Sequence, residues 1–300
     1  MPTNYKKGEN KMKKIYVFGS ANTDLVITSP KMPVSGETIT GSDFFVSRGG
    51  KGANQAVAAS KLGGSVKFCC CLGDDVFGKD ALLSFKEVGI DVSAVRVVKG
   101  VPTGTAVIIV VDGDNRIILD KGANAYLSKE DADEFLKDAE EGDIYLTQLE
   151  NPIDVIGYGL KKAKEKGMYV VLNPAPCNRD ITPFIKYCDL ITPNETELVL
   201  FGGEEELLKL TDNLLVTLGG KGFEIINKNG KTAYPCMKVK AVDTTAAGDT
   251  LCGGLVAGLS LGKDLVESAK YGSLSATVAC TRKGAQISVP TKEEMEKYLK

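Results

Sequence analysis

From Ser128 onward, short apolar runs alternate regularly with longer segments of helical pattern, and this alternation limits the possible folds more than any other feature. The runs predicted to be strands are 143–149, 168–172, 189–192 and 213–218. A helix from Ser128 to Glu141 and another opened by Asn151 and Pro152 are expected between them. Strands that alternate with helices form parallel units, so we expect an α/β fold with a doubly wound, mostly parallel central sheet flanked by helices.

Polar side chains follow the predicted strands at the points where they end. Asn22 and Asp24 come just after the apolar run 14–19, and Glu150 follows 143–149. Later strands run into the polar or glycine positions Asn173, Asn194, Glu197 and 219–222. Each of these could be a cap or a turn by itself. Because open parallel sheets bind ligands at the carboxyl edge of their strands, the set together predicts a site there.

The segment 241–254, AVDTTAAGDTLCGG, begins at the predicted end of a strand that includes Val239 and Val242. It is predicted to form a turn of small residues and then a helix from about Ala247. A helix start carries unpaired N–H groups that can hold an anion. Asp249 would lie beside that anion as a base for an attacking hydroxyl, as phosphoryl transfer requires. The alternative is an ordinary N-terminal turn in which Asp249 interacts with the helix dipole.

A glycine-rich loop, Arg48 to Asn54, leads directly into an alanine-rich helix that stops at Gly63 and Gly64. Such a loop allows a ligand to approach the backbone closely, although glycine turns also occur for packing. It is not a Walker A loop, because Gly52 rather than Ser or Thr follows Lys51.

Two β-prone insertions interrupt the alternation in the first half of the chain. They are the run 37–47 and a hairpin within 101–119, which turns at Asp112 and Gly113. We expect the inserted segments, about 24–49 and 100–121, to form a small β-sheet lid over the site. The alternative is an antiparallel edge on the main sheet.

Composition excludes several classes of site. The chain contains no histidine, which excludes a Ser-His-Asp or Cys-His site and any His-ligated metal. Cys69, Cys70 and Cys71 lie on one predicted strand and must alternate between its faces, so they cannot form one ligand cluster. No Cys-x-x-Cys spacing occurs. Eight reduced cysteines acting as small apolar residues favour a cytoplasmic protein.

Charge and hydropathy indicate neither a nucleic-acid nor a membrane partner. The net charge is −2 with mixed signs, and no apolar run approaches the roughly 20 residues of a bilayer span. Residues 1–13 are polar and are expected to be a flexible N-terminal extension, with residues 14–300 as one domain.

Nine segments closely resemble the ribokinase (PfkB) family of sugar kinases, which also includes fructokinases and adenosine kinase. The resemblance runs from about residue 14 to residue 290. The segments are GSANTD, PVSGETITG, GGKGANQAVAASKLG, GDDVFG, LNPAP, ITPNETE, VTLGGKG, AVDTTAAGDT and TRKGAQISVP. The resemblance implies the ribokinase-like fold and ATP-dependent phosphorylation of the 5-hydroxyl of D-ribose. A kinase for another sugar or a ribonucleoside is the alternative within the family, and a non-catalytic sugar or nucleotide sensor is the alternative outside catalysis.

The resemblance also assigns roles by motif position. Asp249 would be the base, with Ala246, Ala247 and Gly248 forming the anion hole. The sugar would be held by Asn22, Asp24, Gly50, Lys51, Asn54 and Glu150, and would also contact Asp249. The nucleotide would lie along Asn194, Thr217, Leu218, Gly219, Gly220, Lys221, Gly222, Gly248 and Ser273.

Metal ions and a dimer are implied in the same way. Mg²⁺ would arrive with ATP, and Glu197 would act on magnesium and phosphate indirectly. K⁺ would activate from a site formed by Asp243, Thr245, Ala279, Arg282, Gly284 and Ser288, mostly through carbonyl oxygens. Homodimerisation through the lid is typical of the family. The segment between Asn194 and Thr217 is shorter than the family pattern, and it borders the expected nucleotide pocket.

Overall fold

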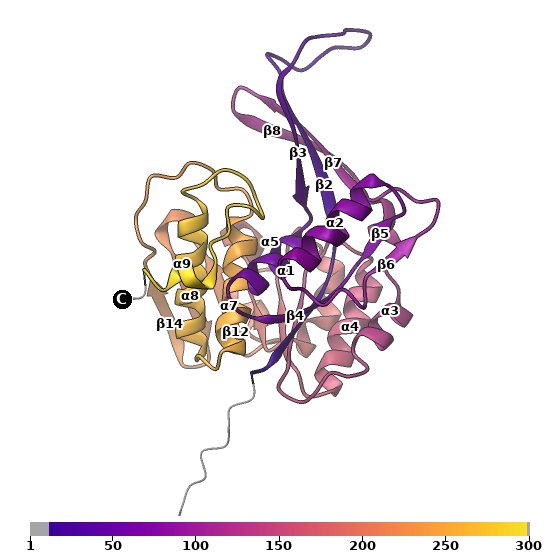
Figure 1. The fold of residues 1–300 in the computed structure, drawn as a ribbon. Helices are drawn as coiled ribbons and strands as arrows, with labels where there is room; N and C mark the ends of the chain where they lie inside the picture. The colour runs from indigo at the N-terminus through magenta and orange to yellow at the C-terminus, as the bar shows by residue number, and fades with distance from the viewer. Residues whose placement is uncertain (1–11, 299–300) are drawn as a thin grey trace, which may run out of the picture.

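The computed structural model describes residues 12–298 (Figure 1). Most of the predicted N-terminal extension therefore lies outside the described residues. A central sheet of eight strands runs through the molecule. In spatial order its strands are β14 (Gly230–Tyr234), β13 (Phe223–Asn227), β12 (Asn213–Thr217), β11 (Leu190–Ile191), β10 (Tyr169–Leu172), β9 (Ile144–Thr147), β1 (Lys14–Phe18) and β4 (Ser65–Cys69).

Most of this sheet is parallel, as the alternating pattern predicts. Strands β4, β1, β9, β10, β11 and β12 pair in parallel, and only the β12–β13–β14 edge is antiparallel. The hairpin β13–β14 accounts for that edge, because two strands joined by a tight turn must run in opposite directions.

Helices cover both faces of the central sheet, so alternate residues of a strand enter different cores. Ile15 and Val17 pack on one side of β1, and Tyr16 and Phe18 pack on the other. Helices α1 (Lys51–Lys61), α2 (Val76–Glu87), α7 (Ala247–Ser260) and α8 (Leu265–Ala279) pack on the first face. Helices α3 (Lys129–Phe135) and α4 (Ile153–Glu165) and the 3₁₀ segment η2 (Arg179–Tyr187) pack on the second.

Glycines let three of these helices approach closely. A Cβ on Gly253 of α7 would lie 2.7 Å from the carbonyl oxygen of Gln55 on α1. A Cβ on Gly254 would lie 2.7 Å from the Cα of Gly272 on α8. Helix α7 is therefore held directly against α1, the helix that follows the glycine-rich loop.

A separate four-stranded sheet projects from the central sheet (Figure 1). Its strands, in spatial order, are β3 (Ser42–Gly49), β2 (Asn22–Thr28), β7 (Gly104–Val111) and β8 (Asp114–Asp120). The predicted hairpin at Asp112 and Gly113 is confirmed. The run 37–47 was placed too early, since the strand begins at Ser42, and Asn22 to Asp24 are the start of β2 rather than a turn.

The three consecutive cysteines lie on the faces that strand alternation requires. Cys69 and Cys71 enter one core and Cys70 the other. The strand is interrupted at Cys70, where β4 gives way to β5 (Cys71–Gly73), which pairs with β6 (Arg96–Val98). All eight cysteines are free thiols.

Three further predicted elements differ from the structure. Val239 and Val242 are not in a strand, because the chain leaves the sheet at Tyr234 and both side chains are exposed. The helix capped by Ser128 ends at Phe135 instead of Glu141, with Leu136 as its C-cap. Asn151 is not the cap of α4, because its side-chain amide donates to the Asn124 carbonyl instead.

The short segment between β11 and β12 contains only α5 (Glu195–Leu200) and the single turn α6 (Glu204–Leu207). The two strands are nevertheless neighbours, with Ile191 paired with Leu214. The remaining elements are the 3₁₀ segments η1 (Gly122–Tyr126) and η3 (Gly219–Lys221) and the short helix α9 (Lys292–Met295). In the described part of the chain, residues 12–298, no helix is long and apolar enough to span a membrane.

Candidate active site

Helix α7 begins where the sequence predicts, and its first turn carries Asp249. The residue before the helix, Ala246, has a φ of 57°, a left-handed conformation that L-residues seldom adopt. Gly248 has open space where a Cβ would stand. The backbone at this helix start is therefore open to a ligand, and its N–H groups can meet an anion.

The Asp249 carboxylate is buried, with 7% of the residue exposed, and both oxygens accept hydrogen bonds. Asn54 Nδ2 donates to one oxygen at 3.0 Å and Gln55 Nε2 to the other at 2.9 Å. Burial raises the pKa of Asp249, although the Lys51 charge and the two amides act in the opposite direction. This carboxylate is a stronger base than an exposed aspartate.

Lys51, the first residue of α1, lies among several carboxylates. Burial would lower the pKa of its amine, but the charges of Asp249, Glu150 and Glu197 outweigh that effect and raise it. The amine therefore stays protonated beside the base, where it can offset negative charge that enters the site.

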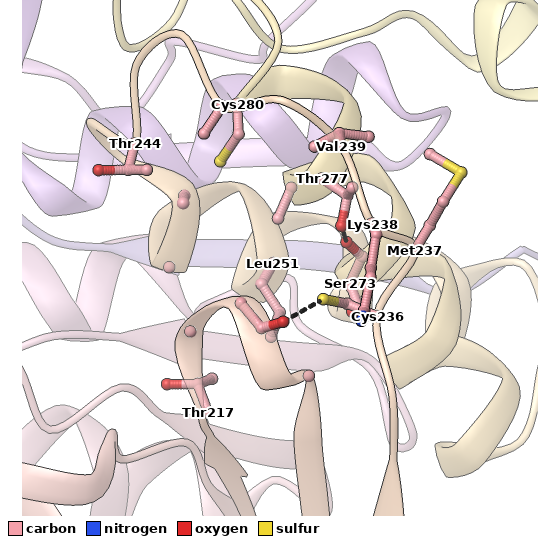
Figure 2. Close-up of a pocket in the computed structure, with 17 residues that line it drawn as sticks. Thr217, Cys236, Met237, Lys238, Val239, Thr244, Leu251, Ser273, Thr277 and Cys280 are labelled. Atoms are coloured by element: carbon pink, nitrogen blue, oxygen red, sulfur yellow. Dashed lines mark hydrogen bonds between the residues drawn. The ribbon is translucent and has the colours of Figure 1, made fainter.

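Two cavities meet at the start of α7. One, of about 200 Å³, is lined by Lys51, Asn173, Asn194, Glu197 and Asp249, among others. The other, of about 420 Å³, extends along α8 and is shown in Figure 2. Four residues line both cavities: Thr217, Thr244, Ala247 and Gly248. The helix start thus separates a polar chamber, lined by Asp249, from a larger, mainly apolar pocket.

The predicted sugar residues lie between the small sheet and α1. Asn22 and Asp24 are on β2, and the Asn22 side chain is held by Asn124 Nδ2 at 2.7 Å. Glu150 accepts the backbone N–H of Lys51 at 2.9 Å. Burial, and then the nearby Glu150, raises the pKa of Asp24 to about 6.

Gly50 is required by its conformation and its surroundings. Its φ is 86°, and a Cβ there would lie 2.7 Å from the backbone nitrogen of Asn22. The structure thus brings Asp24, Lys51 and Asp249 close enough to Glu150 for its negative charge to act on each of them. Of the predicted sugar residues, only Lys51 and Asp249 line the smaller cavity.

Most of the predicted nucleotide residues line the larger pocket. They are Thr217, Gly219, Gly220, Gly222, Gly248 and Ser273. Leu218 and Lys221 are not among its lining residues, and Asn194 lines the smaller cavity instead.

The sequence reasoning missed two walls of the larger pocket, labelled in part in Figure 2. One is the extended segment 236–239 that follows β14, and the other is the face of α8 that continues from Ser273 through Ala276, Thr277 and Cys280. The helical spacing of this second group was a usable signal. Segment 236–239 carried none, because a strand was expected there.

Asn194 and Glu197 form a reciprocal cap at the start of α5. Asn194 Oδ1 accepts the N–H of Glu197 at 2.8 Å, and Glu197 Oε2 accepts the N–H of Asn194 at 2.9 Å. Both residues line the smaller cavity. Within residues 12–298, no three Cys, Asp or Glu side chains cluster to hold a metal ion. A magnesium ion that keeps water and phosphate ligands needs only one or two carboxylates, so Glu197 fits an indirect role.

The residues assigned to a monovalent cation converge in part. Asp243 accepts the N–H of Thr245 and the N–H of Gly284, both at 2.9 Å, which ties the turn before α7 to the loop after α8. Ser288 Oγ donates to the Ala285 carbonyl at 2.8 Å, and the Ala279 carbonyl accepts from Arg282 N–H.

The donor chemistry of this group suits a hard cation. The Arg282 guanidinium is positively charged and is paired with Glu294 at 3.0 Å. Arg282 could therefore contribute only its carbonyl oxygen to a cation. The other donors are a carboxylate, hydroxyls and carbonyls, an all-oxygen set of the kind that hard cations prefer.

Gln55 is a site residue that the sequence did not indicate. It follows Asn54 in an alanine-rich helix and would normally be taken for a solvated position. It is instead completely buried and donates to both Asp249 and Asn173. A buried glutamine on the face of α1 that meets α7 is recognisable only once the two helices are in contact.

Comparisons with known proteins agree with this geometry. The model of the pfkB family of carbohydrate kinases matches residues 12–292. A ribokinase of Haemophilus influenzae is 38% identical over 96% of this chain and 98% of its own, and a deoxyribokinase of Salmonella typhi is 34% identical over 95% and 98%.

A solved structure gives the same result. Arabidopsis thaliana ribokinase, complexed with ribose and ATP, superposes with a TM-score of 0.85 at 30% identity, covering 96% of this chain and 99% of that one. The fold is therefore ribokinase-like, and the enzyme is a sugar kinase. This chain belongs to the pfkB family of carbohydrate kinases.

Proposed function

We propose that this sugar kinase transfers the terminal phosphoryl group of ATP to the 5-hydroxyl of D-ribose, giving D-ribose 5-phosphate and ADP. The observation that carries the proposal is the position of Asp249. It is a buried carboxylate at a helix start, between a polar chamber and a pocket large enough for a nucleoside.

Asp249 would act as the general base. Its carboxylate takes the hydroxyl proton while the hydroxyl oxygen forms a bond to the terminal phosphorus and the bond to the ADP oxygen breaks. The raised pKa makes the carboxylate a better acceptor of that proton. The Asn54 and Gln55 amides each donate to one carboxylate oxygen and so fix the orientation of the carboxylate toward the hydroxyl.

The start of α7 would serve as the anion hole. Ala246, Ala247 and Gly248 all line the smaller cavity, and Ala247 N–H donates to the Thr244 carbonyl at 3.2 Å. This last bond is long, and a transferring phosphoryl group would compete for the same N–H. Lys51 would add a positive charge on the sugar side.

The sugar would lie among Asn22, Asp24, Gly50, Lys51, Asn54 and Glu150. Carboxylates and amides can both orient a ring of hydroxyls, because a hydroxyl donates and accepts. The larger pocket would take the adenine nucleotide between segment 236–239 and α8. The bound relative from Arabidopsis thaliana supports ribose and ATP as the pair of substrates.

Metal ions would support the transfer. Mg²⁺ bound with ATP neutralises phosphate charge, and Glu197 would hold its water shell from the edge of the smaller cavity. K⁺ would be held by Asp243, Thr245, Ala279, Arg282, Gly284 and Ser288. The hydrogen bond from Gly284 N–H to Asp243 joins these residues to the turn that opens α7.

Two alternatives stay open to test. The deoxyribokinase relative favours 2-deoxyribose as a competing substrate, since the two sugars differ by a single hydroxyl. A non-catalytic sensor would retain the pockets without turnover. A coupled assay of ATP consumption over ribose, deoxyribose, hexoses and nucleosides, with and without K⁺, separates these cases. Ribose should give the highest kcat/KM, and a higher value for another compound would overturn the substrate assignment.

We also infer that the enzyme forms a homodimer through the four-stranded sheet. Phe45, Val26, Ile108 and Ile117 are paired across its strands in one row, and Phe45 and Ile117 are 52% and 59% exposed. An exposed apolar row on a sheet with open edges favours pairing with a second copy. Sedimentation should show a dimer that Ile117→Lys weakens, and a monomer at micromolar concentration would contradict the inference.

A further inference from the structure

The hydrogen bonds around Asp249 continue outward through two further amides. Asn54 donates to Asp249, and its own oxygen Oδ1 accepts from Gln286 Nε2 at 3.0 Å. Gln55 also donates to Asp249, and its Oε1 accepts from Gln148 Nε2 at 2.6 Å. The carboxylate is thus the end point of two arms, one through Asn54 to Gln286 and one through Gln55 to Gln148.

The direction of both arms is fixed by chemistry. An ionised carboxylate only accepts hydrogen bonds, so Asn54 and Gln55 must both turn their NH₂ groups toward Asp249. Their carbonyl oxygens then face away and require donors. Gln286 and Gln148 supply those donors, so each amide is oriented by the next one outward.

At the outer end of each arm, a buried glutamine oxygen has no hydrogen-bond partner among the described residues. Four buried side-chain oxygen atoms within residues 12–298 lack a hydrogen-bond partner, and two of them are Gln286 Oε1 and Gln148 Oε1. A buried acceptor is normally paired. Here both glutamines leave the oxygen unpaired while the NH₂ group is used, which is the arrangement expected if their donors serve the carboxylate.

The two outer residues come from distant parts of the chain. Gln148 follows β9 directly, and a Cβ on Gly19 would lie 2.2 Å from its Oε1, so Gly19 leaves room for this side chain. Gln286 is in the loop after α8, which is tied through Gly284 to Asp243. The Gln286 arm therefore connects that loop to the base.

We propose that Gln148 and Gln286 are positioning residues that hold Asn54 and Gln55 with their donors on Asp249 and so keep the base ionised and aimed. The proposal rests on the proposed function of Asp249. The charged and titratable groups that face Asp249 are Lys51, Glu150 and Cys252, and none of them belongs to either arm.

Four variants test the arms. In Gln286→Glu and Gln148→Glu, the new carboxylate cannot donate, so it draws the NH₂ group of its neighbour and turns a carbonyl oxygen toward Asp249. Gln286→Met and Gln148→Met remove the donor at similar side-chain length without reversing the direction. Lys61→Met is the matched control, because Lys61 Nζ donates to the backbone oxygen of Gln286, at 3.3 Å, and not to its side-chain amide.

The expected result is a graded loss of kcat. The Met variants should lose about tenfold and the Glu variants about a hundredfold, with the KM for sugar changed less than about threefold. The acid limb of the kcat profile should move to higher pH in the Glu variants. Lys61→Met should keep its kcat within about twofold. Normal kcat in the Glu variants, or a loss that appears in KM and thermal stability without a shifted acid limb, would overturn the proposal.

A second measurement does not depend on turnover. The carboxyl carbon of Asp249 can be followed by NMR in protein labelled with ¹³C-aspartate, with Asp249→Asn to assign the signal. Its pKa should rise in Gln286→Glu relative to the wild type, and an unchanged titration would overturn the proposal. Should the wild type phosphorylate no sugar or nucleoside, the proposed function fails, while this titration still decides whether the arms act on Asp249.

Discussion

Asp243 and Asp249 stand on either side of the turn that opens α7, and each carboxylate accepts two hydrogen bonds in the structure. Those of Asp243 come from backbone N–H groups, and those of Asp249 come from side-chain amides. Their pKa values nevertheless move in opposite directions. Burial raises the pKa of Asp249, whereas at the half-exposed Asp243 the hydrogen bonds outweigh burial and lower it.

The comparison shows that the number of hydrogen bonds does not decide what a carboxylate does. Desolvation disfavours the charged form strongly only where water is excluded. Asp249 is 7% exposed and has a raised pKa, while Asp243 remains an anion that ties two loops together. The same turn thus contains one residue suited to proton transfer and one suited to structure.

The largest effect should come from Asp249→Asn. The amide cannot accept the hydroxyl proton, so kcat should fall by about 10²- to 10⁴-fold while calorimetry shows sugar binding nearly unchanged. Asp243→Asn is the comparison on the other side of the turn, and because Asp243 is a proposed K⁺ ligand its kcat is measured at saturating K⁺, where it should fall far less. Near-normal turnover in Asp249→Asn would remove the assigned difference between the two residues.

Asp243→Asn should instead reduce stability. The new side chain has one acceptor oxygen in place of two, so either Thr245 or Gly284 loses its partner. A loss of about 1 kcal/mol in the free energy of unfolding is expected, because the site is half-exposed and solvent replaces part of the bond. Urea unfolding measures this loss, and an unchanged midpoint would show that the tie to the 284 loop contributes nothing.

The pH dependence of stability should have opposite signs for the two residues. Asp249, with its raised pKa, stabilises the fold below its ordinary value of 3.8 and loses that contribution as pH rises through its folded pKa. Asp243, with its lowered pKa, contributes above 3.8 and loses that contribution as pH falls through its folded pKa.

Unfolding curves between about pH 3 and pH 7 test this difference. Relative to Asp249→Asn, the wild type should lose stability as pH rises. Relative to Asp243→Asn, it should gain stability over the lower part of the same range. Parallel curves for the wild type and both variants would contradict the assigned pKa directions.

The smallest effect is expected at Ala246, which lies between the two aspartates in a left-handed conformation. Ala246→Gly removes the steric cost of a Cβ at φ 57°, although glycine also adds freedom to the unfolded chain. The variant should be more stable by about 0.5 kcal/mol. A melting temperature below that of the wild type would show that Ala246 carries no strain, and Ala257→Gly, inside α7, is the control that should destabilise.

Much of the fold could be predicted from local pattern. Strands such as β9 and β10 are short continuous apolar runs with polar residues at their ends, and their length and these flanking residues identify them. The failures also have local causes. Val239 and Val242 have the composition of a strand, but no neighbouring strand is available beyond Tyr234, and they lie exposed beside the pocket.

The candidate site was predictable where consecutive residues of one motif form it. Asp249 was found because a turn of small residues followed by a helix is itself an anion site. The 236–239 wall of the larger pocket was not found, because its place depends on how an irregular segment crosses α8. The roles of Asp249 and of the sugar, nucleotide and cation residues remain predictions.

The sequence by itself determined the alternating α/β architecture, the small inserted sheet, and the presence of a carboxylate at a helix start. Only the tertiary structure decided what surrounds that carboxylate. Gln148, from the middle of the chain, and Gln286, from near its C-terminal end, reach it through Asn54 and Gln55 on α1, because glycines bring α1 and α7 into contact. Periodicity fixes which face of a helix is buried, but it does not fix which distant segments meet on that face, and those segments supply the hydrogen-bonding groups around Asp249.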